Sequence, residues 1–465
     1  MLQWIILNDD GENLMYKQNK KQIEEMFQIL LWANDEIKKA IEKRQFESAL
    51  DILEQCQDAA IQLGTSIEKS EGEGFVTVSY IEEFCEEIYQ IHEAIMENGF
   101  ADAISTHKKI SKSLSKIEQS IRNDIPVKKI AVFLPYKASM WDSLESVWKA
   151  ADADSDCDAI VMPIPYYDKN PDGSFADMHY EGEQFPDYVP ITDYQNYDFA
   201  KRRPDMIFIH NPYDECNRVT SVHPFFYSGK LKNLTDQLVY IPYFVLDEID
   251  PKNKMAIQGM RHFCTLPGVA NSHLVIVQSE KMRQVYIDVL TEWAGEASRA
   301  VWEKKILGLG SPKFDRVLDD SIDIQVPEEW KKILYKADGT KKKVILYNTG
   351  LVSMLEHKEA MLDKIENVLQ TFWEKQDDIA LLWRPHPLMI ATIKSMRTEL
   401  WERYEKIITS YRKDGWGIYD DTTDLERAIK LCDAYYGDPS SVIPLCKKAG
   451  VLVMVQNVRN YKRFK

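Results

Sequence analysis

Residues 128–135 read KKIAVFLP and residues 158–165 read DAIVMPIP, two short runs rich in Val, Ile and Ala that are apolar on both faces of a strand. Such runs are typical of parallel strands, because helices cover both sides of a parallel sheet. Similar runs follow between helical or mixed stretches, at 205–210, 237–242, 273–279 and 304–310. Residues 126–335 are therefore expected to form a Rossmann-like α/β domain.

The same alternation restarts after a polar, charged stretch from Asp319 to Lys343, which is predicted to be a linker. Helical patterns separate the apolar runs here as well, and residues 336–465 are expected to form a second Rossmann-like domain. Its strands are predicted at 344–348, 378–385, 415–420, 433–438 and 451–456. Ligands of such sheets bind beyond the carboxyl ends of the strands, so candidate site residues are sought there.

The first 125 residues follow a helical pattern instead. Apolar residues recur at three- and four-residue steps with charged residues between them, which predicts amphipathic helices. Breaks are expected at Gly64 and at 71–74, with further helices over 79–98 and 101–122. This all-α helical module is interpreted as a packing or homo-oligomerisation element, with docking of the lysine-bearing helix 101–122 to an acceptor or a membrane surface as the alternative.

The composition is that of an acidic globular protein. The 465 residues include 58 Lys and Arg against 74 Asp and Glu, a formal net charge of −16 that disfavours nucleic acid as a partner. Seven scattered Cys without paired spacing predict reduced thiols. Neither a signal peptide nor an apolar run of membrane-spanning length is recognised. The expected location is the cytoplasm, with peripheral contact at the inner face of the membrane as a second option.

The sharpest local motif is YGDPSSV, residues 436–442, at the end of a predicted strand. Asp438 stands where a helix N-cap belongs, and Pro439 stands at the first helical position, where its missing N–H costs nothing. Ser440 and Ser441 would then present amides and hydroxyls at the positive end of a helix, which suits a phosphate group. A well-capped helix without a ligand explains the same residues.

A second motif, RPHP, ends the strand predicted at 378–385. Residues two apart on a strand share a face, so Arg384 and His386 are expected to project together at the carboxyl edge. A fixed cation and an imidazole suit a pyrophosphate-bearing donor. The structural alternative is an arginine paired with a carboxylate and a packed histidine.

Further candidates follow other strand ends. Ser311 and Lys313, in GLGSPKFD, are placed to reach a phosphate, although an ordinary turn explains them too. Asn348 and Thr349 end the first strand of the second domain, where backbone amides can approach a ligand. These four residues are predicted to contribute to substrate binding.

His210 follows the third strand of the first domain and is the candidate general base for an acceptor hydroxyl, with a structural histidine as the alternative. Asp142 is a weaker candidate for the same role. No P-loop, no G-x-G-x-x-G after a strand and no H-E-x-x-H or Cys/His cluster occurs. The sequence therefore predicts neither a cofactor nor a metal site.

Five segments together resemble the CDP-glycerol glycerophosphotransferase family, the teichoic-acid-polymerase type of GT-B-like transferase. They are HLVIVQSEKMRQVY, ILGLGSPKFDRV, VILYNTG, LLWRPHPL and DLERAIKLCDAYYGDPSSVIPL. The resemblance spans about 126–457 and is strongest from Asn271 onward. It implies a GT-B arrangement of the two Rossmann-like domains, with a CDP-activated polyol held by the C-terminal one. By resemblance His386, Ser440 and Ser441 bind the donor phosphates, Arg384 supports them and Asp438 fills an acidic position.

One departure from the family pattern concerns the W-H-G-T-P segment, whose histidine is usually taken as the base. This chain reads VYIPYF at 239–244 instead. The expected function is transfer of glycerol phosphate from a CDP-linked donor to a hydroxyl of a cell-surface glycan or polyol-phosphate precursor, with His210 as the base and Lys313 helping to neutralise charge. Two alternatives stay open: a GT-B glycosyltransferase that uses a nucleotide sugar, and a degenerate scaffold of wall-polymer assembly.

Overall fold

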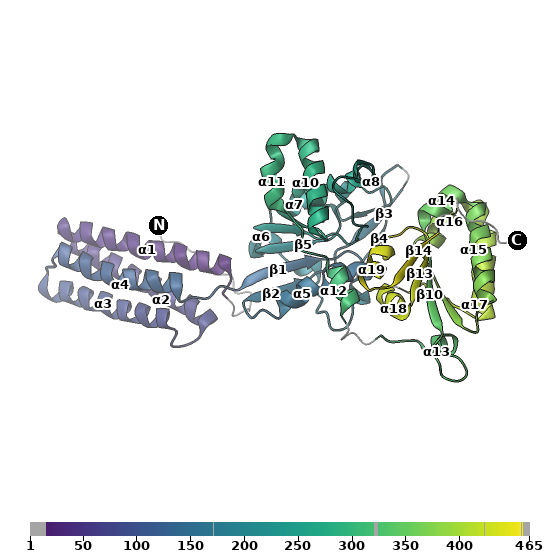
Figure 1. Cartoon of the computed structure of the whole chain (residues 1–465). Coiled ribbons are helices and arrows are strands. Elements are labelled where there is room, and N and C mark those ends of the chain that lie inside the picture. Colours follow the sequence, from purple (N-terminus) through teal and green to yellow (C-terminus); the bar gives the residue numbers. More distant parts are fainter. Residues whose placement is uncertain (1–14, 171, 320–323, 423, 457, 459–465) are drawn as a thin grey trace. The chain divides into compact units, whose positions relative to one another are not determined.

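The computed structural model describes residues 15–170, 172–319, 324–422, 424–456 and 458. Figure 1 shows the chain, which divides into two compact units. The first comprises residues up to 131 with 151–159 and 198–205, and the second comprises 132–150, 160–197 and the chain from 206 onward. The domain boundaries expected near 125 and 335 stay predictions.

Four long helices make up most of the described part of the first unit. They are α1 (Lys17–Glu42), α2 (Phe46–Glu71), α3 (Val76–Asn98) and α4 (Ala103–Asn123). Each packs on the next, and α4 packs back on α1. The break predicted at Gly64 is wrong: α2 runs through it, and a Cβ there would lie 3.4 Å from Cγ2 of Ile81. Because Gly64 has no side chain, Ile81 of α3 can pack closely against α2 at this point.

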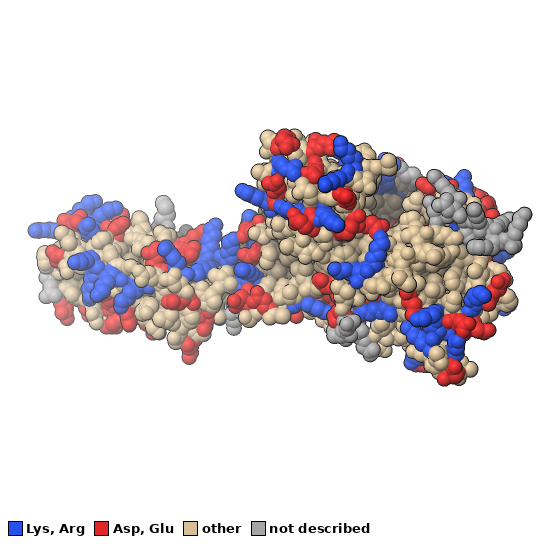
Figure 2. Space-filling model, in the orientation of Figure 1, with Lys and Arg blue, Asp and Glu red and all other residues tan. Residues whose placement is uncertain are grey.

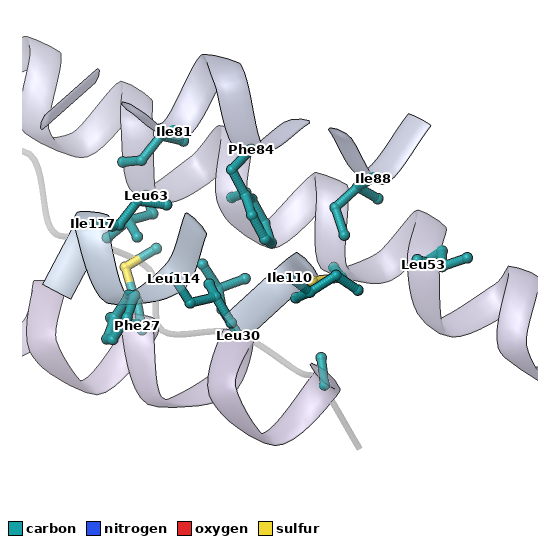
Figure 3. Close-up of a cluster of buried hydrophobic side chains, with 14 of the residues drawn as sticks. Phe27, Leu30, Leu53, Leu63, Ile81, Phe84, Ile88, Ile110, Leu114 and Ile117 are labelled. Atoms are coloured by element: carbon teal, nitrogen blue, oxygen red, sulfur yellow. The ribbon is translucent and has the colours of Figure 1, made fainter. Parts of the chain in front are cut away.

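The core of these helices is a continuous apolar cluster (Figure 3). Phe27 and Leu30 of α1 meet Leu63 of α2, Phe84 of α3 and Leu114 of α4, all of them buried. The apolar stripes predicted from the sequence thus face one another, and burial of apolar surface holds the helices together.

The first sheet has the strand order β2-β1-β5-β7-β8-β9. Its strands are β1 (Lys129–Leu134), β2 (Cys157–Val161), β5 (Met206–Ile209), β7 (Gln237–Tyr240), β8 (Leu274–Ile276) and β9 (Ile306–Leu307). The helices of this region are α5 (Glu145–Asp152), α6 (Phe199–Arg202), α7 (Ser228–Leu231), α8 (Lys254–Cys264), α9 (Pro267–Asn271), α10 (Glu280–Ala294), α11 (Arg299–Lys305) and α12 (Pro312–Leu318). The strand order reverses direction between β1 and β5.

A separate three-stranded antiparallel sheet is formed by strands that follow β2 in the chain. It consists of β3 (Tyr166–Lys169), β4 (Phe175–His179) and β6 (Thr220–Val222), in the order β4-β3-β6.

The second sheet has the order β12-β11-β10-β13-β14. Its strands are β10 (Lys343–Thr349), β11 (Ile379–Pro385), β12 (Ile418–Tyr419), β13 (Ala434–Gly437) and β14 (Leu452–Val455). Its helices are α13 (Glu328–Leu334), α14 (Leu351–His357), α15 (Glu359–Trp373), α16 (Met389–Met396), α17 (Trp401–Asp414), α18 (Leu425–Leu431) and α19 (Val442–Lys448). The stretch predicted as a linker therefore contains a helix, α13.

Both faces of the second sheet are buried. Leu381 and Trp383 pack with α15 and α17, whereas Ala380 and Leu382 pack with α18 and α19. Alternate residues of β11 serve opposite layers, as the period of a strand requires. Two successive parallel sheets after a helical region confirm the predicted fold class.

Charged side chains of both signs intermix on the face that Figure 2 presents. Among the described helices, none combines the length and the apolar character needed to cross a bilayer.

We expect Leu114→Ala in α4 to lower the free energy of unfolding by about 2–5 kcal/mol, because it opens a cavity in a fully buried cluster. Urea denaturation followed by circular dichroism measures the loss. Ile104→Ala on the same helix is the control, since Ile104 is 71% exposed and its truncation removes little packing. Equal losses for the two variants would contradict this account of the core.

Candidate functional site

The chain changes direction across the second sheet between β10 and β13, which are neighbours although β11 and β12 separate them in sequence. Open α/β sheets bind ligands at such a point, beyond the carboxyl ends of the two strands. The segments there are Thr349–Gly350 after β10 and residues 438–441 after β13. The N–H of Gly350 donates to Oδ2 of Asp438 at 2.8 Å, so the two segments are in contact.

A buried ion pair anchors this edge. Asp438 and Lys364 of α15 are both fully buried, and Lys364 Nζ lies 2.7 Å from Oδ1 of Asp438. The same ammonium donates to the carbonyl of Gln456 after β14, also at 2.7 Å. The pair therefore joins α15 to the segments that follow β10, β13 and β14.

Sequence reasoning missed Lys364, although a signal existed. The buried stripe of α15 includes Met361, Ile365 and Val368, and position 364 falls on that stripe. A lysine on an apolar stripe is expected to be buried against an acidic partner, because an unpaired buried charge is costly.

The predicted helix start at Pro439 is wrong. Helix α19 begins at Val442, and the carboxylate of Asp438 is taken up by Lys364 and Gly350 instead of capping a helix. Gly437 has φ of 150°, and a Cβ there would lie 2.1 Å from the carbonyl oxygen of Asn348. Glycine is thus required for β13 to lie this close to β10.

The two serines differ in their surroundings. Ser440 is half-buried, its Oγ accepts from the N–H of Val442 at 3.3 Å, and it lies 3.0 Å from the hydroxyl of Tyr435. That tyrosine donates to the carbonyl of Asp438. Ser441 is exposed, and its hydroxyl makes no hydrogen bond within the part of the chain that the structure describes. It is the more available group for a ligand.

Arg384 and His386 do not project together. Arg384 is buried, forms an ion pair with the fully buried Asp420, and donates to the carbonyl of Thr422 at 2.7 Å. Arg384 therefore holds the segment after β12. This agrees with the structural alternative, an arginine paired with a carboxylate. His386 is exposed just beyond the end of β11.

The imidazole of His386 is positioned by its own turn. Its backbone N–H donates to the carbonyl of Thr349 at 3.0 Å, and Nδ1 accepts from the N–H of Leu388 at 3.1 Å. Partial withdrawal of the ring from water lowers its pKa below 6.5. A neutral ring whose Nδ1 accepts carries its proton on Nε2, so His386 offers an N–H donor at this edge.

The side chains of Asn348 and Thr349 form hydrogen bonds with β11 inside the sheet. Asn348 Nδ2 donates to the carbonyl of Arg384 at 3.0 Å, and Thr349 Oγ1 accepts from Nε1 of Trp383 at 3.2 Å. Both side chains are buried. They fix β10 against β11, and the predicted approach of a ligand to the backbone amides here stays a prediction.

His210 lies at the corresponding point of the first sheet, after β5 and opposite the end of β1. It is fully buried, its Nε2 accepts from the N–H of Tyr136 at 3.1 Å, and its Nδ1 lies 2.9 Å from Oγ of Ser143. Burial, and then the charge of Lys313, lower its pKa to about 3. With both nitrogens occupied, the predicted role as a general base is not supported.

The remaining predicted residues lie near the carboxyl edge of the first sheet. Lys313 is buried and forms an ion pair with Asp142, and Ser311 is buried with an Oγ that has no partner. Ser311 also lines a cavity of about 20 Å³, room for about one water molecule, together with Gln278. These residues form a group of their own around Lys313, apart from the contacts that join Asp438, Ser440 and Gly350.

A second residue missed from the sequence is Arg316 of α12. It forms ion pairs with Glu145 of α5 and Glu426 of α18. Burial alone would raise the pKa of Glu145, but hydrogen bonds from Tyr188 and Lys149 and the charge of Arg316 hold it below 4.5. No local pattern reveals such a contact, because its partners are more than a hundred residues away. Within the described ranges, no three His, Cys, Asp or Glu side chains are grouped to hold a metal ion.

No protein-family model matches the chain, and no curated protein matches it. Among solved structures it is similar to a variant of the wall teichoic acid polymerase TagF, with 14% identity, 80% of this chain and 79% of that chain covered, and a TM-score of 0.39. It is also similar to MnaA of S. aureus with UDP, with 14% identity, 71% and 79% coverage and a TM-score of 0.40. A third is the UDP-GlcNAc 2-epimerase of Methanocaldococcus jannaschii with UDP-GlcNAc and UDP, with 11% identity, 72% and 94% coverage and a TM-score of 0.41.

Lys364→Met is expected to lower the free energy of unfolding by about 3–5 kcal/mol, because it leaves the carboxylate of Asp438 buried without its partner. Urea denaturation measures the loss, and Lys375→Met, an exposed lysine just after α15, is the control. Adding Asp438→Asn to Lys364→Met should recover part of the stability, since the buried charge is then gone. A loss below about 1 kcal/mol for Lys364→Met would rule out the anchoring role.

His210 should make stability depend on pH. The unfolded chain takes up a proton at this residue as the pH falls below 6.5, whereas the native pKa is about 3. The stabilisation is therefore complete above pH 6.5 and is lost as the pH falls toward 3. The advantage of the wild type over His210→Gln should shrink by about 3 kcal/mol between pH 7 and pH 4 in urea denaturation. The exposed His262→Gln serves as the control, and an unchanged gap for His210→Gln would contradict the burial of a neutral ring.

Proposed function

We propose that this chain transfers glycerol phosphate from CDP-glycerol to a hydroxyl of a cell-surface glycan or teichoic-acid-like precursor. The observation that carries the proposal is the coincidence of two features at one edge. The reversal of strand order in the second sheet falls between β10 and β13, and Ser440, Ser441 and His386 lie on the segments that follow these strands and β11. Nucleotide-binding sheets hold their ligands at this point.

Within the described residues, we assign neutral hydrogen-bond donors to meet a pyrophosphate here. They are the Nε2–H of His386, the hydroxyl of Ser441 and the backbone amides that precede α19. Two cations near this edge, Lys364 and Arg384, are committed to Asp438 and Asp420. Donation to an ionised phosphate oxygen is stronger than between neutral groups, so a few such bonds can orient a donor.

In the proposed reaction an acceptor oxygen attacks the β-phosphorus of the donor. One P–O bond forms to the acceptor, the bond to the bridging oxygen breaks, CMP leaves with the bond's electrons, and the proton of the acceptor hydroxyl is released to solvent water. Donors fixed before the reaction stabilise the charge on the transferred phosphoryl group without reorganising. The role of base is not assigned to His210, since its ring nitrogens are already bonded.

The test is calorimetric titration of the full chain with CDP-glycerol, CMP, UDP-GlcNAc and GDP-mannose. We expect CDP-glycerol to bind, and His386→Ala to weaken binding about tenfold or more, the effect of losing one hydrogen bond to a charged group. Ser441→Ala should weaken it less, because backbone amides remain. His262→Ala removes an exposed imidazole elsewhere and should leave the affinity unchanged.

The other outcomes discriminate between the alternatives. Binding of a nucleotide sugar without CDP-glycerol would favour a glycosyltransferase. Binding of none of the four nucleotides would favour the scaffold. If CDP-glycerol binds, release of CMP in the presence of a polyol-phosphate acceptor, measured by chromatography, tests the transfer itself.

A further inference from the structure

A broad groove lies between α15 and α17, on the helical layer of the second sheet and not at its strand ends. Its volume is about 690 Å³, within the range of sites that hold small ligands. Figure 1 shows both helices on the same side of the sheet, and residues of both pack on Leu381 and Trp383. The groove involves none of the residues assigned above to the donor.

Two tryptophans contribute to the lining of the groove. Trp373, at the end of α15, is 48% exposed, and Trp416, just after α17, is half-buried. The ring of Trp416 stands edge-on against Tyr411, with the centroids 5.0 Å apart and the planes at 86°, which holds it in one orientation. Leu369 and Ile407 add apolar surface from the two helices. The groove thus offers one exposed indole, that of Trp373, and a second, half-buried one, that of Trp416.

The polar part of the lining has unused hydrogen-bonding capacity. The side chains of Gln376, Ser410 and Asp414 line the groove, and none of them makes a hydrogen bond within the described residues. They supply donors and acceptors at separate points, as a ligand with several hydroxyl groups would need.

The charges of the lining disfavour an anionic ligand. The lysine there, Lys406, is 2.7 Å from Glu402, and Glu366 is held by Arg403 at 2.6 Å. Among the described residues, the charged side chain of the lining that has no ion-pair partner is Asp414. A phosphate or a carboxylate would have to compete with Glu402 for Lys406 and would be repelled by Asp414, whereas a neutral ligand meets neither cost.

We propose that the groove between α15 and α17 binds a neutral sugar unit of a glycan. A pyranose ring presents an apolar face of C–H groups that fits against an indole, and equatorial hydroxyls that reach the surrounding amide, hydroxyl and carboxylate. Aromatic side chains supply such contact area at low entropic cost. The site is separate from the strand-end edge, and the proposal holds whether or not the chain uses CDP-glycerol.

The test titrates the full chain with maltose, cellobiose and N,N′-diacetylchitobiose, followed by tryptophan fluorescence and calorimetry. We expect saturable binding of at least one disaccharide, with at least a tenfold weaker affinity in Trp373→Ala. Trp373→Phe should keep part of the affinity, because a smaller aromatic face remains. Trp293→Ala is the matched control, since Trp293 on α10 is 55% exposed and lies on the first α/β domain.

Three results would overturn the proposal: no binding of any disaccharide, equal loss in Trp373→Ala and Trp293→Ala, or a wild-type dimer in sedimentation velocity that Trp373→Ala dissociates. The last would make the groove a contact between copies of this chain. Titration of Trp373→Ala with CDP-glycerol separates the two proposals, because a lost sugar site should leave donor binding unchanged.

Discussion

The buried ion pair between Lys364 and Asp438 is the constraint on which the candidate site depends. Taking two charges out of water is costly, and their attraction compensates only when further hydrogen bonds satisfy both groups. Here the carboxylate also accepts from the N–H of Gly350, and the ammonium also donates to the carbonyl of Gln456. The pair therefore sets the spacing of three strand-end segments, and Ser440 and Ser441, which follow Asp438 closely, depend on it for their positions.

Much of the fold could be predicted because its strands are buried on both faces. Runs such as 378–385 identify a parallel sheet by composition alone, and the alternation of Leu381 and Leu382 between two helical layers follows from the period of a strand. The failures have a common cause in tertiary contacts. Gly64 looks like a helix break because it lacks a side chain, but it is retained inside α2 where Ile81 approaches.

The candidate site was less predictable, since side chains there are decided by partners distant in sequence. Arg384 and His386 were expected on one face, but β11 ends at Pro385, so the period of two no longer applies to the histidine. Arg384 forms its ion pair with Asp420, which follows the neighbouring strand β12. No local sequence pattern links these two residues. His210 was placed correctly at a strand end, yet only the fold shows that Tyr136 and Ser143 use both its nitrogens.

Among the described residues, Lys364 and Arg384 near the proposed anion site are paired with Asp438 and Asp420, so the proposal depends on neutral hydrogen-bond donors. The net charge of −16 repels a pyrophosphate at long range, and salt screens that repulsion beyond about 10 Å. Short-range donors such as the imidazole of His386 and the hydroxyl of Ser441 act within that distance, where geometry decides the binding energy. The strand-end edge and the groove between α15 and α17 differ in the groups that they offer to a ligand. Fixed N–H and O–H donors favour a charged group, whereas indole faces and the carboxylate of Asp414 favour a neutral one. The two proposals thus place chemically different ligands on different sides of one sheet, where neither would compete for the other's site.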